Sequence, residues 1–254
     1  MRSNLFFLQN KLHMTGSKTA TSVHPRWNEN PYTYGIDYWG LFNHPAGWRD
    51  VDGEFYEAGT KALLYASTYN TSYSKHALEL SLGNNEVDFV EPLNKVGMSI
   101  KVCRYVTALE STYFNGTIIT NAYQDGSGNW YDGVKIWNRI WTVGYLRTTK
   151  LQNGTDIQKL TQGVDWAAAT ALAYCVYPFN LLGLGSEAEV MAAYGLLYNC
   201  LPTNAGQLVG AYGEPWFIAS LSNYADLVSI KDPNDYRGAG ILLKGSRQIN
   251  HPLA

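Results

Sequence analysis

Charged residues are scarce in this chain of 254 residues. They make up 16% of it, and 19 Lys and Arg are balanced by 21 Asp and Glu. A nucleic-acid-binding protein normally carries a basic stripe, so this balance argues against a nucleic-acid partner. No stretch approaches the roughly 20 apolar residues of a transmembrane helix, so we expect no membrane span. The apolar run at residues 5–8 is shorter than the roughly 7–15 residues of a signal peptide, and residues 1–17 are predicted to form an N-terminal arm.

Cysteine is also scarce. Cys103, Cys175 and Cys200 are far apart in the sequence, and no CxxC pair occurs. Neither a structural zinc site nor a disulfide-rich scaffold is therefore expected. None of the five histidines lies in a local motif with Ser or Cys, so no nucleophile and base are recognisable. Gly-rich phosphate-binding motifs are missing too. We predict that the protein is not an enzyme and holds no cofactor.

Aromatic residues and glycine, by contrast, are abundant. The chain has 19 Tyr, 8 Trp and 24 Gly, and aromatics make up 14% of it. This composition is typical of a compact, loop-rich protein and of neither a disordered chain nor a coiled coil. The length suits one large domain or two small ones and is sufficient for a core without a metal or disulfide.

Alternating polar and apolar residues predict several strands. Residues 76–82 and 87–90 read as a pair of strands joined by a Gly-Asn-Asn turn. Residues 98–106 alternate again and are predicted to form one strand. A further hairpin is expected at 134–143, where two apolar segments flank a Trp-Asn turn.

Helical patterns appear later in the chain. Short helices are predicted at 165–169 and 222–230. Ser186 followed three residues later by Glu189 fits a capping box, which predicts a helix from there to about residue 199. Strands followed by helices, with long Gly-rich connections, indicate an α+β fold.

One loop gathers four acidic residues, Asp50, Asp52, Glu54 and Glu57. Carboxylates of such a loop are suitable ligands for Ca²⁺. The spacing lacks the terminal bidentate Glu of a calcium loop, however, and turn chemistry explains Asp52-Gly53 without an ion. We therefore predict no metal site.

A series of motifs in the later part of the chain resembles a known family. Residues 125–157 read DGSGNWYDGVKIWNRIWTVGYLRTTKLQNGTDI, with a DG turn, a V-K-I strand and a TTK…NG element. D-W-A at 165–167, Y-C-V-Y at 174–177 and Y-G-L-L-Y-N at 194–199 follow. In this order the motifs resemble the first half of the Fibrobacter succinogenes major paralogous domain. The family's G-W-H-V-P element is altered here to GEPWFI at 213–218.

The second half of the same family resembles an earlier part of the chain. GWRDVDGEF at 47–55 is similar to its P-G-G-Y-R loop, and LYASTYN at 64–70 to its W-S-S-T-x-Y-N segment. GMSIKVCR at 97–104 is similar to its closing strand. The two halves of the family thus appear in swapped order.

The swapped order implies a single circularly permuted domain over residues 18–245. Its parts are the family's C-terminal half, a linker, and the family's N-terminal half: residues 18–106, 107–123 and 124–245. Residues 246–254 are then a C-terminal tail. Two tandem half-repeats are the alternative, but half-domains would leave strand edges and apolar faces exposed.

The resemblance implies a C-type-lectin-like fold: a small twisted antiparallel sheet, two or three short helices and long irregular loops. It places the strand at 98–106 beside the hairpin at 134–143. Such a domain could bring Cys103 and Cys175 close together, and the sequence leaves open whether they form a disulfide. The fold also occurs in the formylglycine-generating enzymes and in receptor-binding proteins of phages and bacteria.

Two aromatic loops are the candidate binding site. The residues singled out are Tyr32, Tyr34, Tyr38, Tyr69, Asn70 and Tyr73. Tyr with Asn and Ser offers rigid contact area and adaptable hydrogen bonds. We expect a non-enzymatic binding or structural module, outside the cell, on a cell surface or a virion, whose partner is a glycan or a protein receptor. The alternatives are an enzyme related to the formylglycine-generating group, and a structural subunit of a homo-oligomer or larger particle.

Arg49 is predicted to be structural. It follows Gly47 and Trp48 and precedes Asp50 in a turn. A guanidinium in such a turn can donate to several backbone carbonyls and fix the loop.

Overall fold

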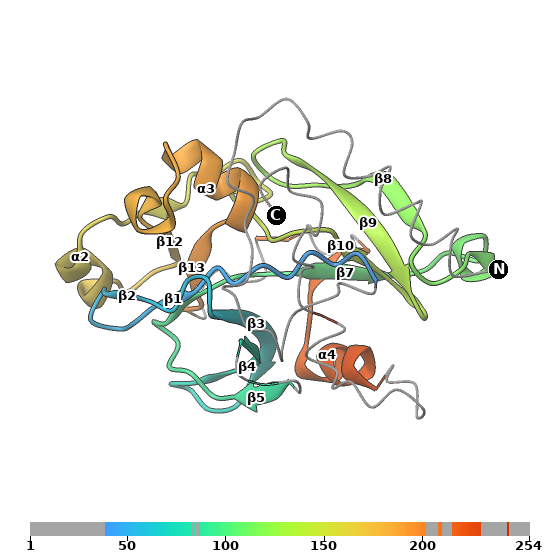
Figure 1. Ribbon diagram of the computed structural model, residues 1–254, viewed down its shortest axis with the longest axis horizontal. Helices are drawn as coiled ribbons and strands as arrows, with labels where there is room; N and C mark the ends of the chain where they lie inside the picture. Colours follow the sequence, from blue (N-terminus) through green and yellow to red (C-terminus); the bar gives the residue numbers. More distant parts are fainter. Residues whose placement is uncertain are drawn as a thin grey trace.

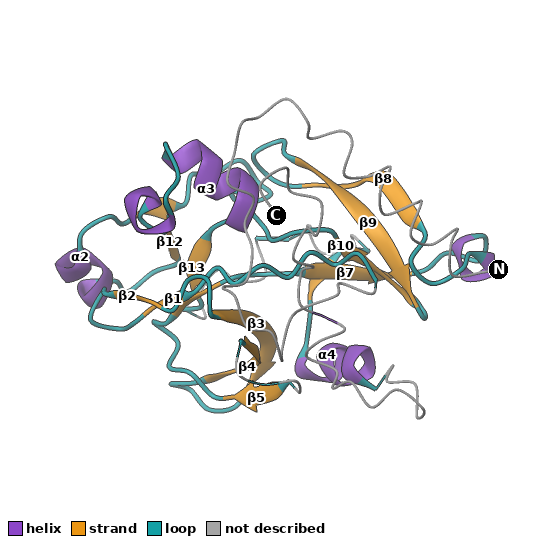
Figure 2. Ribbon diagram, in the orientation of Figure 1, coloured by secondary structure: helices purple, strands orange, loops and turns teal. Residues whose placement is uncertain are grey.

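The computed structural model describes residues 39–82, 84, 87–201, 208–209, 215–229 and 243. This part of the chain is mixed α+β, mostly sheet, with three short α-helices. The predicted α+β class is confirmed. The elements form three sheets rather than the one small sheet that was expected. The sheets meet near the middle of the molecule (Figure 1), and long loops connect the strands and helices (Figure 2).

The six-stranded sheet has the order β11-β12-β13-β6-β1-β2. Its strands are β1 (Trp48–Arg49), β2 (Phe55–Tyr56), β6 (Gly97–Met98), β11 (Gln158–Lys159), β12 (Ala173–Cys175) and β13 (Leu197–Asn199). β11 and β12 are parallel, and the other neighbours are antiparallel. Tyr198 of β13 lies opposite Met98 of β6, so this sheet joins the early and late parts of the chain.

The five-stranded sheet has the order β14-β7-β10-β9-β8 and is antiparallel throughout. Its strands are β7 (Val102–Tyr105), β8 (Ile118–Gln124), β9 (Trp130–Ile136), β10 (Arg139–Thr142) and β14 (Phe217–Ile218). The hairpin of β9 and β10 confirms the predicted pair around the Trp-Asn turn. β7 pairs with β10, Cys103 opposite Trp141, which confirms the predicted pairing of the two segments.

The third sheet contains β3 (Lys61–Tyr69), β4 (Lys75–Ser81) and β5 (Asp88–Val90). β4 and β5 confirm the strand pair predicted at 76–82 and 87–90. Ala77, Leu78 and Leu80 of β4 are buried in the core. The strand pair is present although its burial is not confined to one face: Ala77 and Leu78 are consecutive, so they lie on opposite faces of the sheet, and both are buried.

The segment 98–106 is not one strand, as was predicted. It changes sheets: its first residue ends β6, and Val102 begins β7. Between them the backbone of Ser99 bridges to Leu64 of β3. Lys101, which is 1% exposed, donates to three main-chain carbonyls at the same point. Alternation of polar and apolar residues cannot distinguish one strand from two successive strands that pair with different partners.

The three α-helices are α2 (Gly163–Ala168), α3 (Glu187–Tyr194) and α4 (Leu221–Val228). Short 3-10 helices occur at η1 (Glu110–Thr112) and η2 (Phe179–Leu182). Each predicted helix exists, and no described helix is long and apolar enough to cross a membrane.

Helix α3 begins as predicted but is shorter. The Ser186 hydroxyl accepts a hydrogen bond from the Glu189 backbone N–H at 3.3 Å, as an N-cap does. The helix ends at Tyr194, because Gly195 adopts a positive φ of 68°. Residues 197–199, predicted to be helical, form β13 and pair with two other strands. The tertiary pairing therefore decides the structure of this segment.

The segment 107–123, predicted to be a linker, is partly a strand. It contains η1 and most of β8, which pairs with β9 at the edge of the five-stranded sheet. The division of the chain into permuted halves stays a prediction.

The turn before η1 is held by an ion pair. Both guanidinium NH groups of Arg104 bind the Glu110 carboxylate, at 2.6 and 2.5 Å, and Thr107 N–H donates to the same carboxylate at 2.8 Å. These bonds, those from Arg104 first, lower the pKa of Glu110 from its ordinary value of 4.5 to about 2.

Glu110→Gln is therefore expected to destabilise the protein in a pH-dependent way. A carboxyl group with a lowered pKa in the folded state stabilises it above pH about 4.5, and loses that effect as the pH falls toward 2. The difference in melting temperature between wild type and Glu110→Gln should shrink over this interval. A difference that is constant from pH 6 to pH 2.5 would contradict the account.

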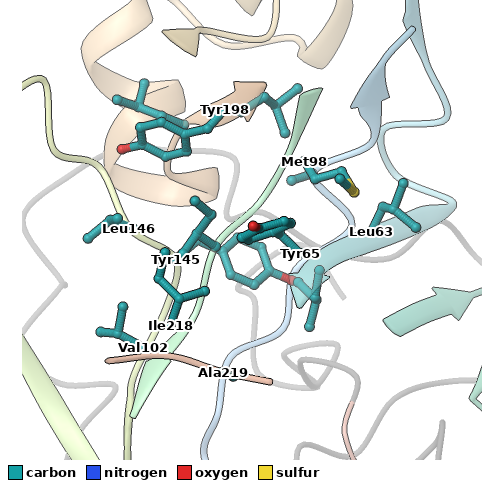
Figure 3. Close-up of a cluster of buried hydrophobic side chains, with 14 of the residues drawn as sticks. Leu63, Tyr65, Met98, Val102, Tyr145, Leu146, Tyr198, Ile218 and Ala219 are labelled. Atoms are coloured by element: carbon teal, nitrogen blue, oxygen red, sulfur yellow. The ribbon is translucent and has the colours of Figure 1, made fainter. Parts of the chain in front are cut away.

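The core lies where the sheets meet. Figure 3 shows a cluster of buried side chains from β3, β6, β7, β13 and β14. Tyr65 of β3 and Tyr198 of β13 are among its largest members, each at most 1% exposed. The Tyr198 hydroxyl donates to the carbonyl oxygen of Thr148 at 2.8 Å, and the Tyr224 hydroxyl donates to that of Tyr65 at 3.2 Å. These two buried hydroxyls are thus satisfied.

Candidate functional site

The loop at 47–55 is fixed by a buried guanidinium. Arg49 is 1% exposed, and it donates to the carbonyl oxygens of Gly53, Leu160 and Thr161 at 2.7, 2.7 and 3.0 Å. The guanidinium also lies 4.6 and 4.8 Å from the centroids of two aromatic rings. The predicted structural role of Arg49 is confirmed: the side chain joins this loop to residues 160–161.

Three of the four acidic residues at 50–57 are engaged in turn or ion-pair contacts. Asp50 Oδ1 accepts from the Val51 backbone N–H at 2.7 Å, and Asp52 Oδ1 accepts from that of Glu54 at 3.1 Å. Glu57 forms an ion pair of 3.0 Å with Lys61. Among the described residues, no group of three or more His, Cys, Asp or Glu is placed to hold a metal ion.

All three cysteines are buried and free. The disulfide between Cys103 and Cys175 that the sequence left open is therefore not formed. Burial raises the pKa of both thiols to about 12, and it raises the pKa of Cys200 well above its ordinary value. A reactive cysteine needs the thiolate, so these three have the character of structural thiols.

The loop after β3 displays an aromatic side chain on a fixed backbone. Tyr73 is 77% exposed. Thr71 Oγ1 accepts from the backbone N–H groups of Tyr73 and Ser74 at 3.2 and 3.1 Å. Asn94 donates to this loop twice, to the carbonyl oxygens of Ser72 at 2.8 Å and of Tyr73 at 2.9 Å. The backbone on both sides of the tyrosine is thus held in one conformation.

The other predicted site residues are only partly described. Asn70 is exposed, and its Nδ2 donates to Glu91 Oε2 at 2.7 Å, which fixes the start of the same loop. The backbone of Tyr69 ends β3, and its side chain lies outside the described residues. Tyr32, Tyr34 and Tyr38 also lie outside them, so their role stays a prediction.

A cavity of about 250 Å³ lies between the turn of the β9–β10 hairpin and helix α4. It is lined by residues of the turn, of the two strands and of the helix with the residue after it: Ile136, Trp137, Asn138, Arg139, Trp141, Asn223, Asp226, Leu227 and Ser229. The lining of this cavity therefore combines apolar, amide and charged side chains. This site was not predicted from the sequence.

Trp137 is the first of the two residues of the hairpin turn. It is 56% exposed and has a φ of +53°, a left-handed conformation that is costly for a bulky residue. Its backbone N–H donates to Asn115 Oδ1 at 2.8 Å, and the Asn138 carbonyl accepts from Val106 N–H at 3.0 Å. The surrounding bonds thus maintain a strained residue, an arrangement that is common at functional sites.

Arg139 and Asp226 form the charged part of the cavity. The Arg139 side chain is 8% exposed and that of Asp226 is 61% exposed, and their closest N–O distance is 3.0 Å. The same guanidinium nitrogen donates to Asn138 Oδ1 at 3.0 Å. The guanidinium also lies 5.0 Å from the ring centroid of Tyr105, which is opposite Arg139 in the sheet. The exposed carboxylate is therefore paired with a largely buried guanidinium.

One signal in the sequence could have indicated this site. Hairpin turns favour Asn, Asp and Gly, which tolerate positive φ. Trp-Asn occupies the turn here, and the residue at a turn is exposed by geometry. A tryptophan in that position has neither a turn preference nor burial to explain it.

Trp137→Gly is expected to be more stable than Trp137→Ala. Both variants lose the indole, but only the alanine variant keeps the free-energy cost of a left-handed conformation. Glycine is in turn disfavoured by its greater freedom in the unfolded chain, so the net difference in stability is about 1 kcal/mol. Thermal unfolding should show a melting temperature a few degrees higher for the glycine variant. At neighbouring Asn138, whose φ is not positive, the order of the two variants should reverse. The same order at both positions would contradict the strain at Trp137.

Comparisons with known proteins add no relative: no family model, no curated protein and no solved structure matches the chain. The resemblance of the motifs to the paralogous-domain family therefore stays a prediction.

Proposed function

We propose that the protein is a non-enzymatic recognition module with a C-type-lectin-like fold, which acts outside the cell, on a cell surface or a virion. It binds a receptor, a glycan or a protein, through exposed aromatic side chains on rigid loops. The observation that carries the proposal is the loop around Tyr73. Its side chain is 77% exposed, while its backbone is fixed by a hydrogen bond from the Tyr73 N–H to Thr71 Oγ1 and by two bonds that Asn94 donates.

A fixed loop supports recognition on thermodynamic grounds. Ordering a mobile loop costs free energy at the moment of binding, whereas a preorganised loop has lost that freedom already on folding. Tyrosine adds a large rigid contact area with few rotatable bonds and a hydroxyl that can donate and accept. An exposed tyrosine held in this way has no evident part in stabilising the fold.

The sheet topology supports the proposed fold. In the resembled family the first and the last strand are neighbours, and here β7 of the early part pairs with β10 of the late part. β6 and β13 join the two parts a second time, in another sheet. Two tandem half-repeats would more readily form separate units, so these pairings favour a single permuted domain.

A glycan array tests the proposal, with wild type, Tyr73→Ala and Phe89→Ala. Phe89 is the matched control, because it is 43% exposed and lies on β5 of the same sheet. We expect Tyr73→Ala to weaken binding at least about fivefold, as loss of an interface anchor does, and Phe89→Ala to leave it unchanged. Melting temperatures of both variants should stay within about 2 °C of wild type.

Light scattering separates recognition from assembly. If Tyr73 packs against another subunit, Tyr73→Ala changes the particle mass. An unchanged mass together with weakened receptor binding supports the proposal. A changed mass supports a structural subunit of a larger particle and contradicts it.

A further inference from the structure

The cavity between the β9–β10 turn and α4 has an aromatic side, the indole of Trp137, and a polar side. The polar side contains Asn223 and the ion pair of Arg139 with Asp226. Trp137 is the half-exposed aromatic member, and Asp226 is the exposed charged member. The volume of about 250 Å³ is below the roughly 300–1,000 Å³ of pockets that enclose a drug-sized ligand. A ligand of one ring is therefore the size that fits.

We propose that this cavity binds a single neutral sugar residue of a glycan. The ring of the sugar lies against the indole of Trp137, and its hydroxyl groups bind the side chains of Asp226 and Asn223. This inference extends the proposed recognition function to a second site, which no residue of the loop around Tyr73 lines.

The aromatic platform fits the apolar face of a pyranose. One face of such a ring exposes C–H groups, and the face of an aromatic ring carries the negative side of its quadrupole. Trp137 offers the largest such surface of any side chain. Its backbone is fixed by Asn115 and by the bond between Asn138 and Val106, so little freedom is lost when a ligand binds.

The polar side of the cavity, with Asp226 and Asn223, is suited to the hydroxyl groups of a sugar. Asp226 Oδ2 accepts from Arg139 at 3.0 Å, which orients the carboxylate, and a carboxylate has acceptor capacity for several further donors. Asn223 Oδ1 accepts from the Ser220 backbone N–H at 2.8 Å, which fixes the amide plane and the direction of its Nδ2 donors. A sugar hydroxyl both donates and accepts, so it can use both groups.

The charge balance favours a neutral ligand. An anion that approaches Arg139 meets the carboxylate of Asp226, and a cation that approaches Asp226 meets the guanidinium of Arg139. Each charge is thus largely compensated by its neighbour at 3.0 Å. A phosphate or an ammonium group would therefore gain little binding free energy here. A neutral polyhydroxylated ring is not repelled by either charge.

Saturation-transfer NMR tests this inference directly. The probes are the methyl glycosides of glucose, galactose, mannose and N-acetylglucosamine, at millimolar concentration, with the wild-type protein. We expect transfer to the ring C–H protons of at least one of them. Trp137→Ala should bind that glycoside at least about tenfold more weakly, because the platform is lost. Asp226→Asn, which keeps the shape but removes the charge, should weaken it severalfold.

Trp130→Ala is the matched control. Trp130 is 50% exposed and lies at the opposite end of β9, away from the cavity. It should leave the binding of the glycoside unchanged. No transfer to any of the four probes, undiminished binding by Trp137→Ala, or an equal loss in Trp130→Ala would each overturn the inference.

The same variants separate this inference from the proposed function. Tyr73→Ala should bind the glycoside as wild type does, although it weakens receptor binding. If Trp137→Ala weakens attachment to a protein receptor and no glycoside shows transfer, the cavity is a protein contact and the sugar inference fails while the recognition function stands. If the glycoside binds at Trp137 but Tyr73→Ala does not weaken binding to any receptor, the sugar inference stands and the proposed role of the loop around Tyr73 fails.

Discussion

Arg49→Ala is expected to lower the free energy of unfolding by about 3–5 kcal/mol, the largest effect of any single substitution proposed for this chain. The side chain is 1% exposed, and each of its three guanidinium nitrogens donates to one carbonyl oxygen, those of Gly53, Leu160 and Thr161. Truncation leaves these carbonyls without their donors, at roughly 1–3 kcal/mol for each that stays buried. It also opens a gap between two aromatic rings.

Denaturant unfolding measures this effect, and Arg147→Ala is the control. Arg147 is half-buried, lies 4.8 Å from the ring centroid of Tyr131, and donates from its guanidinium to one carbonyl at 3.2 Å. Its loss should cost about 1 kcal/mol or less. Arg49→Lys should lose most of the stability too, because an ammonium cannot reproduce the planar fork. Equal effects of Arg49→Ala and Arg147→Ala would show that the loop does not depend on this guanidinium.

Lys101→Met is expected to cost about 3–4 kcal/mol. The ammonium donates to the carbonyl oxygens of Leu41, Thr142 and Gly144 at 2.6, 2.9 and 2.9 Å, at the point where the chain passes from one sheet to the next. Methionine has a similar length but no donor, so buried carbonyls lose their partner. The effect should appear as faster hydrogen exchange in β7 and β10 and as a lower denaturant midpoint.

Lys95→Met is the matched control for Lys101→Met. Its ammonium donates to one carbonyl oxygen, that of Ala167, at 2.6 Å, from a half-buried position. The expected cost is about 1 kcal/mol. If both lysine variants lose the same stability, or if β7 and β10 keep their protection in Lys101→Met, the junction does not rely on the ammonium.

The sequence predicted the elements whose pattern is local. The strand pair around the Gly-Asn-Asn turn, the hairpin around Trp137 and the start of α3 at Ser186 all depend on neighbouring residues, and all three are present. The structural role of Arg49 followed from the chemistry of a guanidinium in a turn. Its partners at 160–161 did not, because they are distant in sequence.

The sequence could not predict what depends on distant pairing. The change of sheets at Ser99–Lys101 requires the positions of three other segments, and a single alternating pattern does not contain them. The end of α3 was placed too late for the same reason, since β13 is stabilised by its neighbours in the sheet. The cavity at Trp137 needs helix α4 beside the hairpin, and only the fold brings the two together.

The candidate site was predicted in part. The sequence indicated that Tyr73 is a surface residue of a polar loop, and its side chain is 77% exposed. It did not indicate the hydrogen bonds from Asn94, which lies after β5 and closes the loop from the other side. The composition of a loop can be read from the sequence, whereas its rigidity comes from contacts with residues far along the chain.

One property defines a recognition module: it binds its ligand and releases it unchanged. Calorimetric titration of a glycan selected on the array tests it most directly, with wild type and the double variant Tyr73→Ala/Trp137→Ala, followed by mass spectrometry of the recovered glycan. The account predicts saturable binding by wild type, a loss of at least about tenfold in the double variant, and a recovered glycan of unchanged mass. A glycan that is cleaved or modified, or equal binding by the two proteins, would contradict it.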